Sequence, residues 1–348
     1  YLKLKSSIGL LGNQSTYGFA GYYPFYPGIR TGVQEVGVFG TTAYLAATPA
    51  YLKNPDLKWE TINSFDLGLE MVAFDNRLHF EYTYYNKTTK DMMTYINLSS
   101  LGLYDILVNG GKVRNWGHEF SAGWKQQLGD ITLTVDGNIT FMDNKVISLA
   151  EELPNGIIID ARANNGSAEA RTMAGQPIGS FFGYVVEGLY QTDLDRLLSP
   201  NADGVGSYFN GDFKFKDVNG DGVITPEDRT IIGNPSPDFI YGGSVNLEYK
   251  GFNLGVDFGG VYGNEVFRVW GSLESPFQRV NYPALKTARW HGPGTSNWEP
   301  IISQAHRFNY NGSTYNIEDG SYFRIRNIQL GYNVKSPFLT RAHIKDLR

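Results

Sequence analysis

The chain has 348 residues, of which 41 are Gly, 23 are Tyr and 21 are Phe, a composition that disfavours a helical bundle or a helix-rich enzyme. Thirty Lys and Arg against 35 Asp and Glu give a net charge of −5, so no basic excess is present to bind nucleic acid. Cysteine is absent, which excludes disulfides, thiolate metal sites and cysteine nucleophiles.

Apolar and polar residues alternate with a period of two in many segments, a pattern typical of strands with one buried face. Phe65, Leu67 and Leu69, for example, alternate with polar residues and Gly. The pattern predicts about eight strands, in chain order at 2–10, 64–73, 78–87, 113–128, 131–142, 239–250, 252–262 and 328–334. Several of them are longer than the usual strand of a globular protein.

The connections between these strands alternate between short and long. Tight turns are predicted at 74–77, 129–130 and 250–251, whereas long excursions are predicted at about 12–60, 89–112, 148–237 and 267–319. This order favours an outer-membrane β-barrel, whose periplasmic turns are short and whose extracellular loops are long. The fold class we predict is therefore all-β: an antiparallel transmembrane barrel segment with long extracellular loops.

The polar side of the predicted strands carries several charged residues, which we expect to line an aqueous lumen: Asp66, Glu70, Glu81, Glu119, Lys125 and Asp136. The strands of a soluble β-sandwich or jelly roll would show the same alternation, so these folds are one alternative. A small barrel that closes by itself is another. The sequence contains no run of 18 apolar residues of the kind that forms a transmembrane helix.

Several stretches resemble the SusC/RagA family of TonB-dependent outer-membrane transporters, in order and spacing over nearly the whole chain. Two of them precede predicted strands, at Asn54-Pro55-Asp56-Leu57-Lys58-Trp59-Glu60 and at Ile232-Gly233-Asn234-Pro235. The others are Tyr84-Tyr85-Asn86-Lys87-Thr88-Thr89, Gly175-Gln176-Pro177-Ile178-Gly179-Ser180-Phe181-Phe182-Gly183-Tyr184, Asp217-Val218-Asn219-Gly220-Asp221-Gly222 and Glu318-Asp319-Gly320-Ser321-Tyr322-Phe323-Arg324-Ile325-Arg326-Asn327.

The resemblance implies an outer-membrane importer of oligomeric nutrients, a glycan more than a peptide, and no enzymatic activity. It implies a plugged barrel of about 22 strands, of which residues 1–348 would be the C-terminal portion without the plug. The implied partners are TonB, which would act through the missing N-terminal part, and a SusD-like surface lipoprotein that forms a lid. The alternatives are a surface glycan-binding β-protein without transport activity and a passive structural or adhesive barrel.

One segment has the ligand spacing of a calcium loop. The candidate ligands fall at positions 1, 3, 5, 7, 9 and 12 of that loop and are Asp217, Asn219, Asp221, the Val223 carbonyl, Thr225 and Asp228. Gly222 permits the sharp turn and Ile224 should point away from the loop to anchor it. We predict a structural Ca²⁺ site, with a metal-free turn held by its own side-chain hydrogen bonds as the alternative.

Aromatic residues in the long excursions are candidate substrate contacts, because flat rings with a polar edge stack on sugars or peptide side chains. These residues are Tyr22, Tyr23, Tyr26, Trp290 and Trp298. Packing of the loops on their own aromatics or on the partner lipoprotein is the alternative. No spacing of His or of paired carboxylates predicts a catalytic centre.

Overall fold

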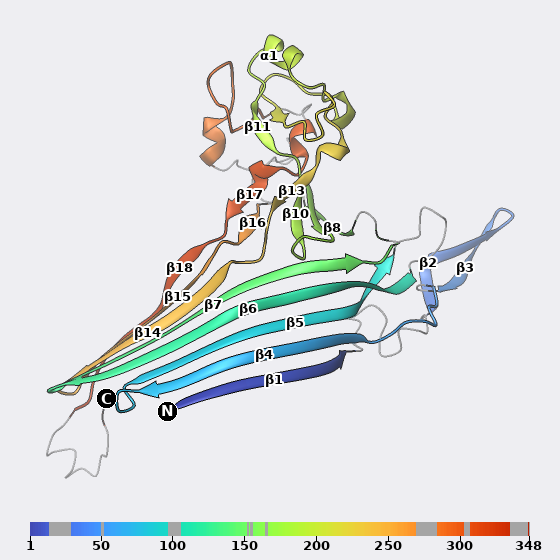
Figure 1. Cartoon of the computed structure of the whole chain (residues 1–348). Coiled ribbons are helices and arrows are strands. Elements are labelled where there is room, and N and C mark those ends of the chain that lie inside the picture. The colour runs from blue at the N-terminus through green and yellow to red at the C-terminus, as the bar shows by residue number, and fades with distance from the viewer. Residues whose placement is uncertain are drawn as a thin grey trace.

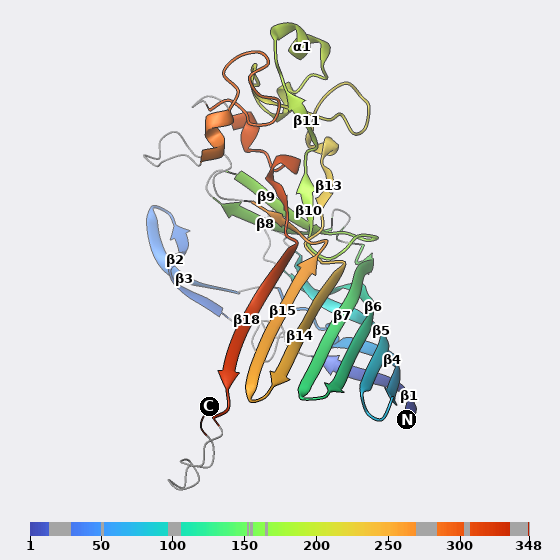
Figure 2. The same cartoon turned by 90° about the vertical axis from the view of Figure 1, so that its left-hand side faces the viewer.

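The computed structural model describes residues 1–13, 29–49, 52–96, 106–151, 153, 156–163, 166–268, 284–302, 307–334 and 347. These residues form an antiparallel sheet of eight long strands, whose spatial order follows the chain order (Figure 1). The strands are β1 (Leu2–Asn13), β4 (Glu60–Ala73), β5 (Leu78–Ile96), β6 (Ile106–Leu128), β7 (Ile131–Leu149), β14 (Phe239–Tyr249), β15 (Phe252–Tyr262) and β18 (Tyr322–Tyr332). The sheet is curved and its strands are tilted (Figure 2).

All eight predicted strands are present, but most of them are longer than predicted, and in two regions the extra length lies beyond a bulge that interrupts the alternation. The predicted excursion at 89–112 is mostly strand, since β5 and β6 remain paired out to Ile96 and Ile106. Their register shifts between Thr89 and Met93, where Asp91 has a φ of 56°. Similarly, β18 begins at Tyr322 and not at 328, and its register shifts opposite Asp257 and Phe258.

The short turns and long connections lie at opposite ends of the sheet, as predicted. The three tight turns contain positive φ angles, at Phe74 (55°), Gly129 (61°) and Lys250 (47°) among other residues. Each turn joins strands that are paired up to their last residues. The long connections leave from the other end, where the chain forms a separate layer of short elements above the sheet (Figure 1).

The register gives the sheet one apolar and one polar face, because residues opposite each other on paired strands share a face. Three rows of apolar residues cross the sheet in register: Trp124–Val135–Val245–Val256–Ile328, Leu133–Leu247–Leu254–Leu330 and Ile131–Tyr249–Phe252–Tyr332. Leu330 is 73% exposed and Leu4, which belongs to the same face near the other edge, is 75% exposed. An apolar face this exposed on this many strands is suited to lipid contact.

Shorter elements occupy the long connections. A separate hairpin consists of β2 (Ile29–Phe39) and β3 (Thr42–Pro49), and a four-stranded sheet has the order β13-β10-β9-β8. Its strands are β8 (Ile157–Ala163), β9 (Gly166–Thr172), β10 (Ser180–Gly183) and β13 (Thr230–Gly233). Two further pairs are β11 (Val186–Leu189) with β12 (Phe213–Phe215), and β16 (Glu265–Phe267) with β17 (Ile317–Asp319).

The helices of the described residues are short and lie in the same layer. They are α1 (Asp193–Leu198) and the 3-10 turns η2 (Asp203–Val205), η3 (Pro226–Asp228), η4 (Ala284–Ala288), η5 (Arg307–Tyr310) and η6 (Thr314–Asn316). Among the described residues, no helix is long and apolar enough to cross a membrane. We call the described residues of 166–238 and 284–319 the distal module.

A cluster of buried apolar residues lies in the distal module. It contains stacked rings, with Tyr184 4.6 Å from Phe215 and Phe215 4.9 Å from Phe308 between ring centroids. The complete cluster is Tyr184, Leu189, Ala202, Phe213, Phe215, Ile224, Phe308 and Tyr315. Asn144 on β7 links this module to the sheet, because its side chain bonds both the Ile178 N–H and the Ser236 hydroxyl.

Candidate functional site

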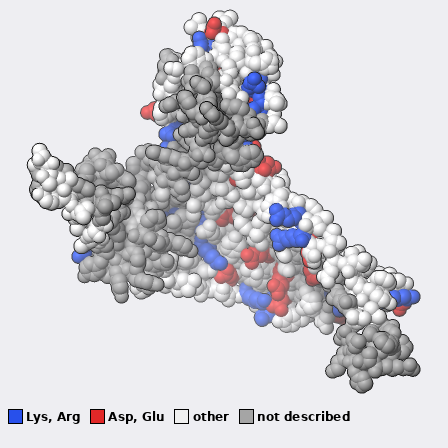
Figure 3. All heavy atoms as spheres, turned by 180° about the vertical axis from the view of Figure 1, so that it is seen from behind, with Lys and Arg blue, Asp and Glu red and all other residues white. Residues whose placement is uncertain are grey.

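The polar face of the sheet carries the charged residues that the sequence predicted for a lumen. Glu70 and Glu81 lie directly opposite each other on β4 and β5, and Lys5 of β1 forms an ion pair with Glu70 that offsets their repulsion. In-register partners place the remaining ones on the same face: Asp66, Glu119, Lys125 and Asp136. Figure 3 shows acidic and basic side chains interspersed along the sheet.

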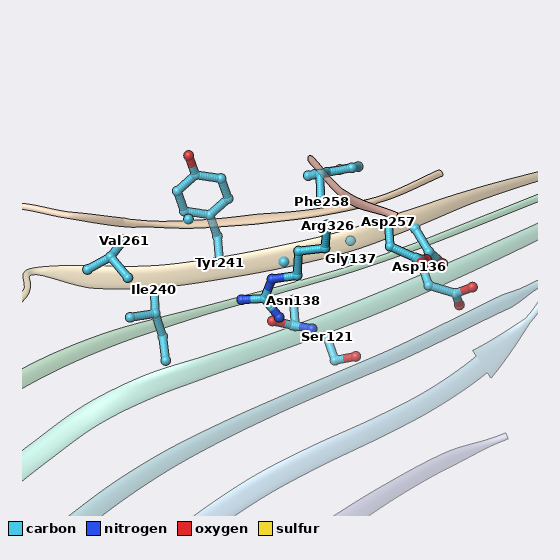
Figure 4. A pocket seen from close by; sticks show the side chains of 14 residues that line it. Ser121, Asp136, Gly137, Asn138, Ile240, Tyr241, Asp257, Phe258, Val261 and Arg326 are labelled. Atoms are coloured by element: carbon cyan, nitrogen blue, oxygen red, sulfur yellow. The ribbon is translucent and has the colours of Figure 1, made fainter. Parts of the chain in front are cut away.

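A cavity of about 520 Å³ lies against strands β7, β14, β15 and β18. Its polar lining comes from Asp136, Asn138, Asp257 and Arg326, together with hydroxyl groups. Figure 4 shows Asn138 and the Arg326 guanidinium on the same side of the sheet, whereas the ring of Tyr241 points to the other side. Glycines on neighbouring strands, which are Gly137, Gly242, Gly243 and Gly260, leave the backbone open to this space.

The candidate calcium ligands belong to one turn after β12, in which Asn219, Asp221 and Val223 are exposed. Both carboxylate oxygens of Asp217 accept backbone N–H groups, from Gly220 and Gly222, each at 2.7 Å. Asn219 donates from its amide to Asp221, whose other oxygen accepts the Val223 N–H at 2.8 Å. These are the hydrogen bonds of the metal-free alternative. Within the described part of the chain, no group of three or more His, Cys, Asp or Glu side chains is placed to hold a metal ion, so the Ca²⁺ site stays a prediction.

Asp228 closes the loop from inside the distal module and is fully buried. Its carboxylate accepts the Thr225 N–H at 2.7 Å, the Val218 N–H at 2.9 Å and the Asn219 N–H at 3.4 Å. Burial alone would raise the pKa of Asp228, but these N–H groups together hold the pKa below its ordinary value. Ile224 is fully buried in the module core, as predicted for the residue that anchors the loop.

Two of the candidate substrate contacts, Trp290 and Trp298, lie in the described part of the distal module. Trp290 packs against the module core and donates from Nε1 to the Gln191 side chain at 3.2 Å. Trp298 is 52% exposed, and its ring centroid lies 5.7 Å from that of Tyr315. The remaining candidates, Tyr22, Tyr23 and Tyr26, lie outside the described residues.

A buried polar cluster beneath Trp298 was missed by the sequence reasoning. Lys286 and Glu299 form a buried ion pair, and the Tyr315 hydroxyl donates to Glu299 at 2.8 Å. The Arg268 guanidinium lies 4.8 Å from the Tyr315 ring centroid and also pairs with Glu318. Burial raises the pKa of Tyr315 far above its ordinary value. No local motif could have revealed this cluster, because its members are dispersed over some fifty residues of connecting chain.

The long antiparallel strands, the exposed apolar face and the charged opposite face together define the wall of a transmembrane β-barrel. Comparison with family models identifies it further. The model described as "TonB dependent receptor-like, beta-barrel" matches residues 13–347, and the chain belongs to this family. Proteins of this family are located in the outer membrane, so the resemblance and the location inferred from the sequence are confirmed.

Similar proteins are themselves TonB-dependent receptors. The chain is 32% identical over 305 residues to TonB-dependent receptor P3 of Formosa agariphila, covering 85% of this chain and 29% of that one. It is 25% identical to TonB-dependent receptor SusC of Bacteroides thetaiotaomicron, covering 98% of this chain and 32% of that one. The chain thus spans about a third of the length of these relatives.

Among solved structures, that of the RagAB peptide transporter has the same fold. It superposes with a TM-score of 0.73 at 21% sequence identity, over 97% of this chain and 34% of that one. The RagAB peptide importer in its "open-open" state gives a TM-score of 0.71 at 20% identity. At these identities the similarity establishes the fold of the eight-stranded sheet and its distal module.

Proposed function

We propose that the whole protein imports oligomeric nutrients across the outer membrane, with TonB supplying the driving force. The observation that carries this proposal is the sheet with two opposed faces. Its apolar face suits lipid, and its polar face offers Asp, Glu, Lys, Asn and Arg side chains to a hydrated path. In this proposal the chain has no catalytic residue, and residues 1–348 contribute barrel wall and extracellular loops.

We propose a glycan as the substrate in preference to a peptide. Support comes from the exposed indole ring of Trp298 in the distal module, since such rings stack on sugars. The polar side chains that line the sheet cavity are planar or hydroxylic, and such groups bind the hydroxyls of sugars. A peptide is the second candidate, because a structure with the same fold is titled a peptide transporter.

We also propose that a SusD-like surface lipoprotein covers the distal module as a lid. Support comes from the position of this module, which stands above the end of the sheet from which the long connections leave (Figure 2). Its tip exposes apolar residues of α1, with Leu197 81% exposed. Purification of the full-length protein from its native membrane, followed by peptide mapping, tests this partner. A stoichiometric lipoprotein is expected, and its absence under mild detergent contradicts the lid.

Uptake by whole cells tests the import proposal. Cells with and without the full-length gene are given fluorescently labelled oligosaccharides or oligopeptides, and internal label is measured before and after an uncoupler. Gene-dependent uptake of an oligosaccharide that stops with the uncoupler is expected. Gene-dependent binding at the surface without uptake supports the alternative of a surface glycan-binding β-protein. Uptake of oligopeptides alone overturns the glycan assignment but leaves import in place.

A further inference from the structure

The register shift in β18 places consecutive polar side chains on the same face of the sheet. Arg324 lies opposite Gly259 and Asn327 lies opposite Asp257, and both partners belong to the polar face. Arg326 is the residue that the shift leaves without a partner in register. Its side chain lies on the same face as that of Arg324, whereas the side chain of Ile325 between them lies on the opposite face. The bulge therefore adds a second guanidinium to the polar face beside Asn327.

The Arg326 guanidinium has a defined position above a glycine. A Cβ atom built on Gly259 would lie 3.1 Å from Nη2 and 3.2 Å from Cζ of Arg326, so the side chain lies low across the backbone of β15. A residue larger than Gly at 259 would push the guanidinium away from the sheet. The neighbouring Gly242 leaves similar space in front of Asn138, whose Oδ1 would be 3.6 Å from a Cβ there.

The two carboxylates that line the same cavity do not neutralise this guanidinium. Asp257 accepts a hydrogen bond from Asn327 at 3.2 Å, and neither Asp257 nor Asp136 forms an ion pair with Arg326. Figure 4 shows the guanidinium directed away from both carboxylates and toward Asn138. Within the described part of the chain, Arg326 makes no hydrogen bond and no ion pair, and it is exposed to the cavity.

Three kinds of donor therefore face one space on the barrel wall: the planar fork of Arg326, the amide of Asn138 and the hydroxyl of Ser121 (Figure 4). A guanidinium fork matches the two oxygens of a carboxylate, and charge-assisted pairs of this kind are the strongest hydrogen bonds in proteins. Ile240 at the other end of the cavity offers an aliphatic surface to a carbon frame. We propose that this cavity is a carboxylate-binding site on the lumenal wall.

This proposal rests on the proposed function only for its assignment of the polar face to the lumen. The carboxylate has two possible sources. It belongs either to an acidic solute in transit, such as an oligosaccharide with uronic acids, or to an Asp or Glu side chain of the same protein that enters the lumen. Both sources present the same group to Arg326, and the experiment below separates them.

The test uses the full-length protein in detergent, with glutarate as the probe and its neutral diamide, glutaramide, as the matched control. Binding is measured by saturation-transfer NMR, and thermal unfolding is recorded in parallel. The variants are R326Q, R326K and K125Q, the last of which removes a positive charge from the polar face outside the cavity. If a solute is the source, glutarate binds and glutaramide does not, and R326Q weakens binding roughly tenfold or more. R326K weakens binding less, and K125Q leaves it unchanged.

If a side chain of the protein is the source, the probe does not bind to the unmodified protein. R326Q then lowers the unfolding temperature by several degrees, R326K restores part of this loss, and K125Q has no such effect. Two results together would overturn the proposal. The first is that glutarate binds no better than glutaramide and that R326Q does not change its binding. The second is that R326Q and K125Q unfold at the same temperature. If the protein binds glutarate as expected but cells that carry its gene take up no labelled oligosaccharide or oligopeptide, the result would instead count against the import proposal.

Discussion

Replacement of Asp228 by Ala tests how the predicted calcium loop is held. The change removes a buried carboxylate that accepts three backbone N–H groups, at 2.7, 2.9 and 3.4 Å, and that closes a capping box with Thr225. A lost capping interaction costs about 1 kcal/mol, and a buried donor without a partner costs about 1–3 kcal/mol. Val218 is 45% exposed, so water can partly replace the hydrogen bond that its N–H loses. We therefore expect local opening to become easier by about 2–3 kcal/mol.

Hydrogen exchange followed by mass spectrometry measures this effect in the segment 217–228 of the full-length protein. A loss of about 2–3 kcal/mol corresponds to exchange that is about 30-fold to 160-fold faster. Glu227→Ala is the matched control, because it removes the neighbouring carboxylate, which is exposed and accepts no hydrogen bond from the loop. Equal exchange rates in the Asp228→Ala variant and the control would refute the reasoning that Asp228 holds the loop.

If the loop binds calcium with a dissociation constant of about 10⁻⁴–10⁻³ M, 10 mM calcium should slow hydrogen exchange in the loop by an amount equivalent to about 1.4–2.7 kcal/mol. Magnesium should have no such effect. If calcium has no effect either, the metal-free turn is the correct alternative. As the pH falls below about 3.8, the ordinary pKa of an Asp, intrinsic fluorescence should report progressive unfolding of the distal module, because the pKa of Asp228 is lowered in the folded protein and its contribution to stability is lost as the pH falls through that lower pKa; Asp228→Asn should lack this step. Glu299→Gln should destabilise the distal module by about 3–5 kcal/mol in thermal unfolding, since Lys286 stays buried without its counter-ion. Val135→Arg should impair folding into lipid vesicles by up to about 2–4 kcal/mol while Thr134→Arg on the opposite face should not, and equal effects would contradict the assignment of faces.

Strand positions and the two faces could be predicted from the sequence because each residue's side of a strand depends only on its parity. Leu67 and Val245, for example, both fall on the apolar face as their alternation indicates. Parity is lost at a bulge, which is why the outer parts of β5 and β6 and the start of β18 were not predicted. The start of β18 includes Arg326. The sequence analysis named this residue only as part of the family resemblance and did not predict that it lies in a strand or on the polar face.

The distal module could be predicted only in part. Ile224 was placed correctly, since the spacing of the loop fixes which residue points inward. The environment of Trp290 depends on its contact with Gln191, about one hundred residues away in the chain. The Lys286–Glu299 pair likewise joins two residues that are more than ten positions apart. Such contacts follow from the folding of long connections, and no local periodicity encodes them. This is why a substrate surface could not be derived from aromatic content alone.

As a barrel wall, the eight-stranded sheet has lipid on one side and water on the other. The most direct measurement places spin labels one at a time along residues 244–248 of β14 in the full-length protein reconstituted in liposomes. Accessibility to oxygen, which partitions into lipid, should be high at Val245 and Leu247, and accessibility to a water-soluble nickel chelate should be higher at Ser244, Asn246 and Glu248. Accessibilities that do not alternate with a period of two, or that alternate in the opposite phase, would contradict the account.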